Sequence, residues 1–494
     1  MLTFLISIVV LVVGYLFYGV FVERIFSPDD RKTPAVSHPD GVDYIPLPLW
    51  KTFLIQVLNI AGLGPIFGAL LGAMWGPVVY LWIVFGTIFA GAVHDFLSGM
   101  ISERNDGASI SEIVGIYLGT GMRQVMRVFS VVLLVMVGTV FMVGPAGLLA
   151  LLTPEALSRE FWLIVILIYY FLATLLPIDK IIGKVYPFFG VALIVMCLGV
   201  GGGTLLLRGN QMPELWSNFG NQHAAGLPIW PLMFITVACG AISGFHATQS
   251  PIMARCMTSE REGRTLFYGA MVAEGIIAMI WAAAGVAFYE SGGTKALFEA
   301  AAAVKNNQAT MVYQISTGLL GTIGGILAMI GVIACPITSG DTAFRSARLT
   351  LADWIRWDQK DIHKRLLLAV PLLGAGFIIS RFDYGIVWRY FSWSNQTLAM
   401  IALWAGAVYL AKNNKNHWIA AIPATLMSAV SCTYLLVANE GFGPMLAGLQ
   451  GGASLAGAER IALAGRIAYP IGLLFALCCL GLFIAKVRRM PKTS

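Results

Sequence analysis

Long apolar runs separated by short polar segments fill almost the whole chain. A helix that crosses a membrane needs about 20 apolar residues, and thirteen stretches of this sequence come near that length. We therefore expect an all-helical polytopic membrane protein with about thirteen transmembrane helices. The expected spans are 2–22, 53–73, 78–101, 127–150, 161–178, 185–207, 229–250, 267–288, 316–338, 366–380, 392–411, 418–438 and 467–486.

Two of these runs are interrupted by glycine, proline and polar residues. One break lies in IQVLNIAGLGPIFGALLG at 55–72, and the other in FITVACGAISGFHATQSPIMARCM at 234–257. Irregular backbone at membrane depth must be buried in protein or line a cavity, and paired broken helices are the sequence pointer to a transporter's substrate site. The substrate contacts expected from the breaks are Gly62, Gly64, Pro65, Ser243, Gly244, His246 and Gln249.

The broken runs also divide the chain. With 2–22 set aside as an extra first helix, they open two blocks of five spans, 53–207 and 229–411, that start from opposite sides of the membrane. This is the relation expected of a five-plus-five inverted repeat, although the blocks share no obvious residue-level similarity. Residues 418–486 would add two peripheral helices to a single transmembrane domain, 1–494.

The basic residues predict the orientation. When successive loops are placed on alternate sides, 24 of the 32 Lys and Arg residues fall on one side. The positive-inside rule makes that side cytoplasmic, with the N-terminus outside and the C-terminus in the cytoplasm. Residues 2–22 lack a basic leader and a small-residue cleavage site, which favours a spanning helix over a removable signal.

Composition supports the membrane class and excludes others. The chain has 494 residues, of which 58% are hydrophobic and 12% charged, and its mean hydropathy is +0.79. The net charge of +7 is spread over short loops, so it does not indicate nucleic-acid binding. The seven cysteines lack metal-ligand spacing, and GxxxxGK[ST] is absent. We expect no enzyme, no cofactor and no metal apart from a sodium ion.

Four ionisable groups lie inside predicted spans. A charged side chain is energetically costly there, so these groups are functional candidates. His94 and Asp95 form either a proton- or ion-carrying site or a buried pair capped by backbone or an arginine. Because adjacent residues point to different faces of a helix, we expect that the two do not serve one cavity. Glu274 either couples an ion or, as we favour, pairs with an interfacial arginine. For His246 we favour a direct role, since histidine titrates between pH 5 and 8.

Hydroxyl and carboxylate oxygens also gather where the ninth span is expected to end. Hard monovalent cations bind such oxygens together with unwound carbonyls, so a sodium or proton site against the backbone near 60–63 is one interpretation. The other is a helix C-terminus with its acid paired to Arg345. The residues concerned are Thr338, Ser339, Asp341 and Thr342.

Span 392–411 contributes two amides, Asn395 and Gln396. They could bind a carboxylate or a peptide bond of the substrate. They could equally bridge helices, as polar residues often do in membranes, and we favour the bridging interpretation.

Seven blocks resemble the carbon starvation protein A family of bacterial transporters. They occur in the expected order over most of the chain. The blocks are DGVDYIPL at 40–47, IAGLGPIFG at 60–68, GAVHDF at 91–96, CGAISGFHATQSP at 239–251, AEGIIAMIWA at 273–282, PITSGDTAFRSARL at 336–349 and WSNQTLA at 393–399.

The resemblance implies an inner-membrane uptake system used during carbon starvation, with a LeuT-type fold. It implies peptides as substrate, or pyruvate moved with protons in some relatives. Two departures separate this chain from longer members: it ends after the thirteenth span, and 56–59 replaces a histidine-containing sequence before the first break. Substrate and coupling ion are therefore expected to differ.

We therefore expect a secondary active symporter that imports a peptide or a pyruvate-like carboxylate with a proton or sodium ion. Its partners would be that solute, the ion and the lipid bilayer. A membrane nutrient sensor that binds without net transport is the alternative. An intramembrane aspartyl protease built on Asp95 and Asp341 would need two carboxylates that share a proton, and the family blocks argue against it.

Overall fold

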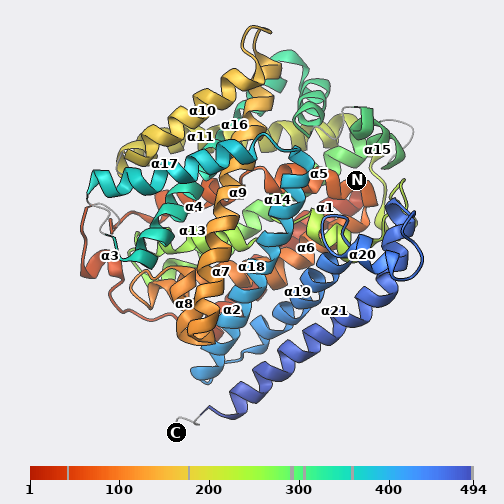
Figure 1. Ribbon diagram of the computed structural model, residues 1–494. Coiled ribbons are helices and arrows are strands. Elements are labelled where there is room, and N and C mark those ends of the chain that lie inside the picture. Colours follow the sequence, from red (N-terminus) through yellow and green to blue (C-terminus); the bar gives the residue numbers. More distant parts are fainter. Residues whose placement is uncertain (42–43, 176–177, 290–293, 304–307, 358–360, 491–494) are drawn as a thin grey trace.

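The computed structural model is helical and has no strand in the residues that it describes, which are 1–41, 44–175, 178–289, 294–303, 308–357 and 361–490 (Figure 1). The predicted all-helical class is confirmed. In chain order the helices are α1 Leu2–Val13, α2 Gly19–Phe26, α3 Pro34–Ser37, α4 Leu49–Ile60, α5 Ala69–Gly72, α6 Val78–Gly86, α7 Ala92–Glu103, α8 Ile110–Leu118, α9 Thr120–Leu152, α10 Arg159–Leu175, α11 Ile178–Arg208, α12 Phe234–Thr236, α13 Gly244–Ala254, α14 Ala270–Phe288, α15 Thr294–Ala303, α16 Gln308–Ile355, α17 Ile362–Ile379, α18 Tyr384–Lys412, α19 Trp418–Val437, α20 Gly443–Gly448 and α21 Gly457–Arg488.

Nine helices within these described ranges are long and apolar enough to cross a membrane, and one bent pair would make ten. The protein is thus a multi-pass membrane protein. Three further predicted spans coincide with α10, with the broken pair α12 and α13, and with α18. The count of thirteen is not confirmed and stays a prediction, as do the boundaries of the two repeats.

Both predicted breaks are present. α4 ends at Ile60, and a π-helical turn, Gly64–Gly68, resumes the helix at an angle of 54° to α4. The second break separates the end of α12 from Gly244, where α13 begins. The two breaks pack against each other, because a Cβ on Gly64 would lie 2.1 Å from the Cβ of Cys239. Only glycine permits that approach.

The ninth predicted span differs from expectation at both of its ends. Gly321, with φ of 68°, interrupts α16, so the long apolar helix begins after it. The helix then continues through Pro336 to Ile355 rather than ending near 338. The hydroxyls beyond Pro336 satisfy carbonyls of the preceding turn, as when Thr342 donates to Thr338 O at 3.2 Å. These oxygens therefore lie in mid-helix and do not form a helix C-terminus.

The centre and the periphery of the bundle are clearly separated. In the most apolar window of the span that contains α6 and α7, 83% of the residues are buried, against 22% for α21. Figure 1 shows α21 as a long helix along one edge of the molecule, beside α19. The spans that contain α7 and α14, each 83% buried over this window, therefore belong to the centre of the bundle.

Candidate functional site

A buried cluster of ionisable side chains joins three helices beside the second break. His246, in the first turn of α13, places Nδ1 2.8 Å from Oδ2 of Asp95 in α7. Its Nε2 lies 3.1 Å from Oε2 of Glu274 in α14. All three side chains are fully buried. The sequence predicted each of them as a candidate, and the structure brings them together.

His94 belongs to the same cluster, although we expect that His94 and Asp95 do not serve one cavity. The Nδ1 atom of His94 lies 2.8 Å from Oδ1 of Asp95. A carboxylate has two oxygens, so Asp95 contacts one imidazole with each of them. His94 therefore reaches His246 through Asp95 rather than through a shared cavity.

Glu274 does not pair with an interfacial arginine, contrary to the interpretation that we favoured. Its carboxylate lies instead beside the His246 ring, and neither carboxylate oxygen is aligned for a hydrogen bond with any described residue. The arginines between the end of α13 and the start of α14 have other partners. Arg255 donates to Gly107 O at 2.9 Å, Arg261 pairs with Asp30 at 2.7 Å, and Arg264 pairs with Glu23 at 2.8 Å.

This arrangement can accept and release a proton. A histidine between two carboxylates offers a titratable group and two oxygens within proton-transfer distance. In the part of the chain that the structure describes, no group of three or more His, Cys, Asp or Glu side chains could hold a metal ion. The position of His246 between two carboxylates suits proton transfer.

The predicted ion site in α16 lies against α4, one turn away from the expected carbonyls. Ser339 Oγ donates to Leu58 O and to Cys335 O, both at 3.0 Å, and Thr338 Oγ1 lies 3.4 Å from Leu58 O. Asp341 is buried on the same helix, and its Oδ1 has no hydrogen-bond partner among the described residues. The hydroxyls thus make a polar contact between helices at the first break.

The two amides of α18 bridge helices, as we favoured. Asn395 Oδ1 accepts the backbone N–H of Phe245 at 2.7 Å and so caps α13 from a neighbouring helix. Its Nδ2 donates to Ser243 Oγ at 3.1 Å. Gln396 donates to the backbone carbonyl of Phe234. Gln249, also buried, donates to Ser346 Oγ on α16 at 3.3 Å. These side chains hold the second break in place.

A cavity of about 830 Å³ lies on the side opposite the basic loops. Its wall includes residues of the helical segments that run from each break toward that side, such as Phe67 and Thr236, together with residues of α9 and α18. None of the predicted substrate contacts at the breaks is among its lining residues. The break glycines instead pack against protein, Gly62 against Phe141 and Gly244 against α18.

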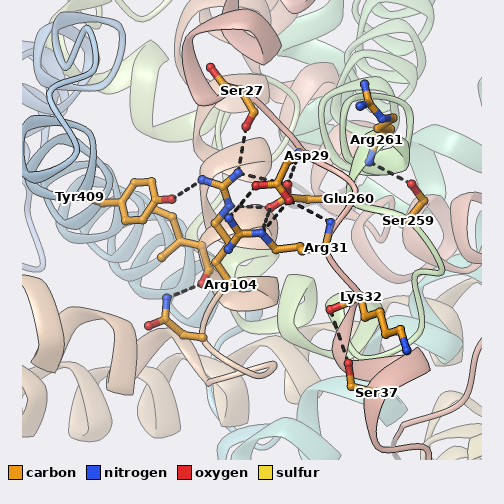
Figure 2. A network of polar contacts seen from close by, with 12 residues as sticks. Ser27, Asp29, Arg31, Lys32, Ser37, Arg104, Ser259, Glu260, Arg261 and Tyr409 are labelled. Carbon is orange, nitrogen blue, oxygen red and sulfur yellow. Dashed lines mark hydrogen bonds and ion pairs between the residues drawn. The ribbon is translucent and has the colours of Figure 1, made fainter.

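A network of ion pairs and hydrogen bonds lies on the opposite, basic side (Figure 2). Glu260 is fully buried, and its Oε1 lies 2.5 Å from Nε of Arg104 at the end of α7. Arg104 also donates to the Tyr409 hydroxyl of α18 at 2.9 Å and to Ser27 O at 3.0 Å. The segment after α2 joins through Asp29, whose backbone N–H donates to Glu260 Oε2 at 2.5 Å.

A neighbouring arginine favours the charged form of the Asp29 carboxyl in this segment. Hydrogen bonds from the Arg31 side chain and backbone hold the pKa of the Asp29 carboxyl well below its usual range. Glu260 and Arg104 are not predicted from the sequence, because their positions are those of ordinary loop charges. Their sequence signal is position: each lies at the end of a span that comes next in the chain after a broken span.

Comparison with known proteins assigns the chain to a family. The model of the family described as carbon starvation protein CstA matches residues 1–156 and 150–323. An uncharacterized membrane protein of Haemophilus influenzae is 42% identical over 59% of this chain and 92% of its own length. The peptide transporter CstA of Escherichia coli is 24% identical over 89% of this chain and 80% of its own.

A second relative and two solved structures extend the comparison. The pyruvate/proton symporter BtsT of Escherichia coli is 28% identical over 56% of this chain, but the match spans only 47% of that protein. A mutant of the manganese transporter of Eremococcus coleocola aligns with a TM-score of 0.56 at 14% identity, over 92% of this chain and 99% of that one. MhsT in complex with L-phenylalanine aligns with a TM-score of 0.50 at 15% identity, over 87% and 98%.

These solved structures share the LeuT-type fold, which confirms the fold that the resemblance implied. The family match covers more than half of the chain, and the named relatives are transporters rather than enzymes. The chain therefore belongs to the carbon starvation protein CstA family, whose members include transporters of peptides and of pyruvate.

Proposed function

We propose that the protein is a secondary active symporter that imports a small organic nutrient, a peptide or a pyruvate-like carboxylate, together with protons. The relatives' names, peptide transporter CstA and pyruvate/proton symporter BtsT, support the solute class. The LeuT-type fold supports alternating access around a central site. The basic side of the molecule faces the cytoplasm of a bacterial inner membrane, with the N-terminus outside and the C-terminus inside.

The observation that carries proton coupling is the position of His246 between Asp95 and Glu274. The three residues come from α13, α7 and α14, so the charge of the cluster acts on the contact between the broken helix and two neighbours. An uncompensated charge in a low-dielectric interior is costly. Protonation of the cluster therefore biases the position of α13, which begins at the break.

The polar network on the basic side suggests how the transporter opens to the cytoplasm. In this conformation the cavity opens away from the basic loops, while Arg104 and Glu260 join α7 to the start of the span that contains α14. The proton and the solute together would favour the state in which this network is broken and the cavity opens to the cytoplasm. Each ligand shifts the equilibrium by its differential affinity for the two states.

The test is uptake into liposomes that contain the purified protein. Radiolabelled pyruvate and trialanine are compared under an imposed proton gradient and an imposed sodium gradient. We expect one solute to accumulate under the proton gradient, and a protonophore to abolish the accumulation. Binding without accumulation under either gradient would contradict the proposal and favour a nutrient sensor.

A further inference from the structure

One face of α18 carries polar atoms that the protein leaves without partners. The Tyr384 hydroxyl, the Trp388 Nε1–H and the Ser392 hydroxyl are all buried and have no hydrogen-bond partner among the described residues. All three residues line the cavity on the side opposite the basic loops. Residues four apart lie on one side of a helix, about 6 Å from each other along its axis. The three groups therefore form a stripe along the cavity wall.

The other two tryptophans of the same helix have partners for their indole N–H groups. The Trp393 Nε1–H donates to Ser431 O at 3.1 Å, and the Trp404 Nε1–H donates to Ser428 Oγ at 3.0 Å. Buried donors in folded proteins nearly always have partners, because an unmet one is destabilising. Trp388 and Ser392, which are 4% and 1% exposed, depart from this rule where the helix faces the cavity. Their partners are therefore expected to arrive with a ligand.

We propose that Tyr384, Trp388 and Ser392 form a hydrogen-bonding ladder that positions the carbonyl or carboxylate oxygens of the transported solute. This inference rests on the proposed transport function. The middle rung is decisive, because an indole N–H can only donate, whereas the two hydroxyls can donate or accept. The solute must therefore present an acceptor oxygen to Trp388.

The cavity wall is better suited to hydrogen bonds with the solute than to an ion pair between the solute and an unpaired arginine. Two of the three arginines that line the cavity have acidic partners: Arg381 lies 2.6 Å from Glu160, and Arg389 pairs with Glu440. The cavity volume of about 830 Å³ lies within the range of ligand sites, roughly 300–1,000 Å³. The ladder thus supplies oriented donors in a site whose charges are largely paired.

The spacing of the rungs separates two kinds of solute. An extended peptide spans about 3.3–3.6 Å per residue, so carbonyls two residues apart match the roughly 6 Å between neighbouring rungs. A three-carbon oxo acid is too short to reach more than one rung. Loss of one rung should therefore weaken the binding of a peptide only partly. It should weaken the binding of a small carboxylate strongly if that rung holds it, and otherwise not at all.

The test compares Trp388→Phe and Ser392→Ala with the wild-type protein in liposomes, with pyruvate and trialanine as probes. If trialanine is the accumulated solute, we expect each variant to raise its KM about 3- to 10-fold, the usual effect of one lost hydrogen bond. If pyruvate is the accumulated solute, Trp388→Phe should raise its KM at least this much, and Ser392→Ala should leave it unchanged. The melting temperature without solute should stay the same or rise, because each variant removes a buried group that has no partner. Stabilisation by millimolar solute in the same melting assay should shrink.

Trp393→Phe is the matched control. It removes the same indole N–H, but one that is bonded to Ser431, so it should lower the melting temperature and leave KM unchanged. If Trp388→Phe behaved like Trp393→Phe, the ladder would be structural and the inference overturned. If the wild-type protein transports a probe while the ladder variants keep its KM, only the ladder fails. If neither probe is transported by, or stabilises, the wild-type protein, both proposals fail.

Discussion

Asp95 is the centre of the ionisable cluster, and its replacement by asparagine is the most informative perturbation. Its two carboxylate oxygens each lie 2.8 Å from an imidazole Nδ1, one of His94 and one of His246. Asparagine keeps the shape and one acceptor oxygen. It removes the negative charge and turns an NH₂ group toward one of the two rings, so one of the two contacts is lost.

The structure sets the size of the effect. A hydrogen bond to a charged group contributes about 1.5–3 kcal/mol, and 1.4 kcal/mol corresponds to a factor of about 10. Loss of one such bond should therefore lower the population of the proton-loaded state by roughly 10- to 150-fold. Breaking a buried pair by removing one partner also costs stability, about 3–5 kcal/mol, so a lower melting temperature should accompany the change.

The assay is uptake in liposomes, in two modes. We expect Asp95→Asn to lose at least about nine tenths of proton-driven accumulation, while exchange of labelled for unlabelled solute without a gradient continues. Exchange does not require net proton movement, so this split separates a coupling defect from a misfolded protein. Glu112→Gln is the control: it removes an ion pair with Arg127 at a partly exposed site, which is worth at most about 1 kcal/mol.

One result would refute the reasoning. If Asp95→Asn accumulated solute as the wild-type protein does, with the same dependence on external pH, the coupling proton would not pass through this cluster. The polar contact between α16 and α4 would then be the next candidate.

Three further outcomes are expected. Ser339→Ala should lose its hydrogen bond to Leu58, lowering stability by about 0.5–1.5 kcal/mol in a melting assay, while proton-driven accumulation persists; a loss of uptake that depended on sodium would instead indicate an ion site. Glu260→Gln should speed amide exchange of 27–37, measured by mass spectrometry, because that segment is tied to the Glu260 carboxylate; unchanged exchange would argue against a closing network. Burial lowers the pKa of His223 to about 4, so as pH falls from about 6.5 to 4 the unfolded chain binds a proton that the folded protein does not. Stability should fall in that window by about 1–2 kcal/mol after allowance for partial solvation, and His223→Gln should remove the dependence.

The helix breaks show what a sequence pattern can and cannot predict. Glycine and proline within an apolar run leave backbone groups that cannot be satisfied by a regular helix, so both breaks were predictable from composition and spacing. Their mutual packing was not, because the contact between Gly64 and Cys239 joins residues far apart in the sequence. The predicted substrate contacts at the breaks stay predictions, since the described cavity lies beside them and not on them.

The α16 hydroxyls and Glu274 illustrate the opposite case. Hydroxyls followed by basic residues look like a helix end, yet the helix continues because these side chains bond carbonyls of the preceding turn. Glu274 looked like a partner for nearby arginines, yet each of these has another partner, which the local sequence does not reveal.

The sequence by itself determined the membrane class, the helical fold, the two breaks and the identity of the ionisable groups. These properties depend on hydropathy and on local backbone chemistry, which act over a few residues. Only the tertiary structure decided which of those groups meet: it placed His246 between Asp95 and Glu274, and aligned Tyr384, Trp388 and Ser392 along a cavity. Pairing of this kind depends on how helices distant in sequence pack, and no local pattern encodes that packing.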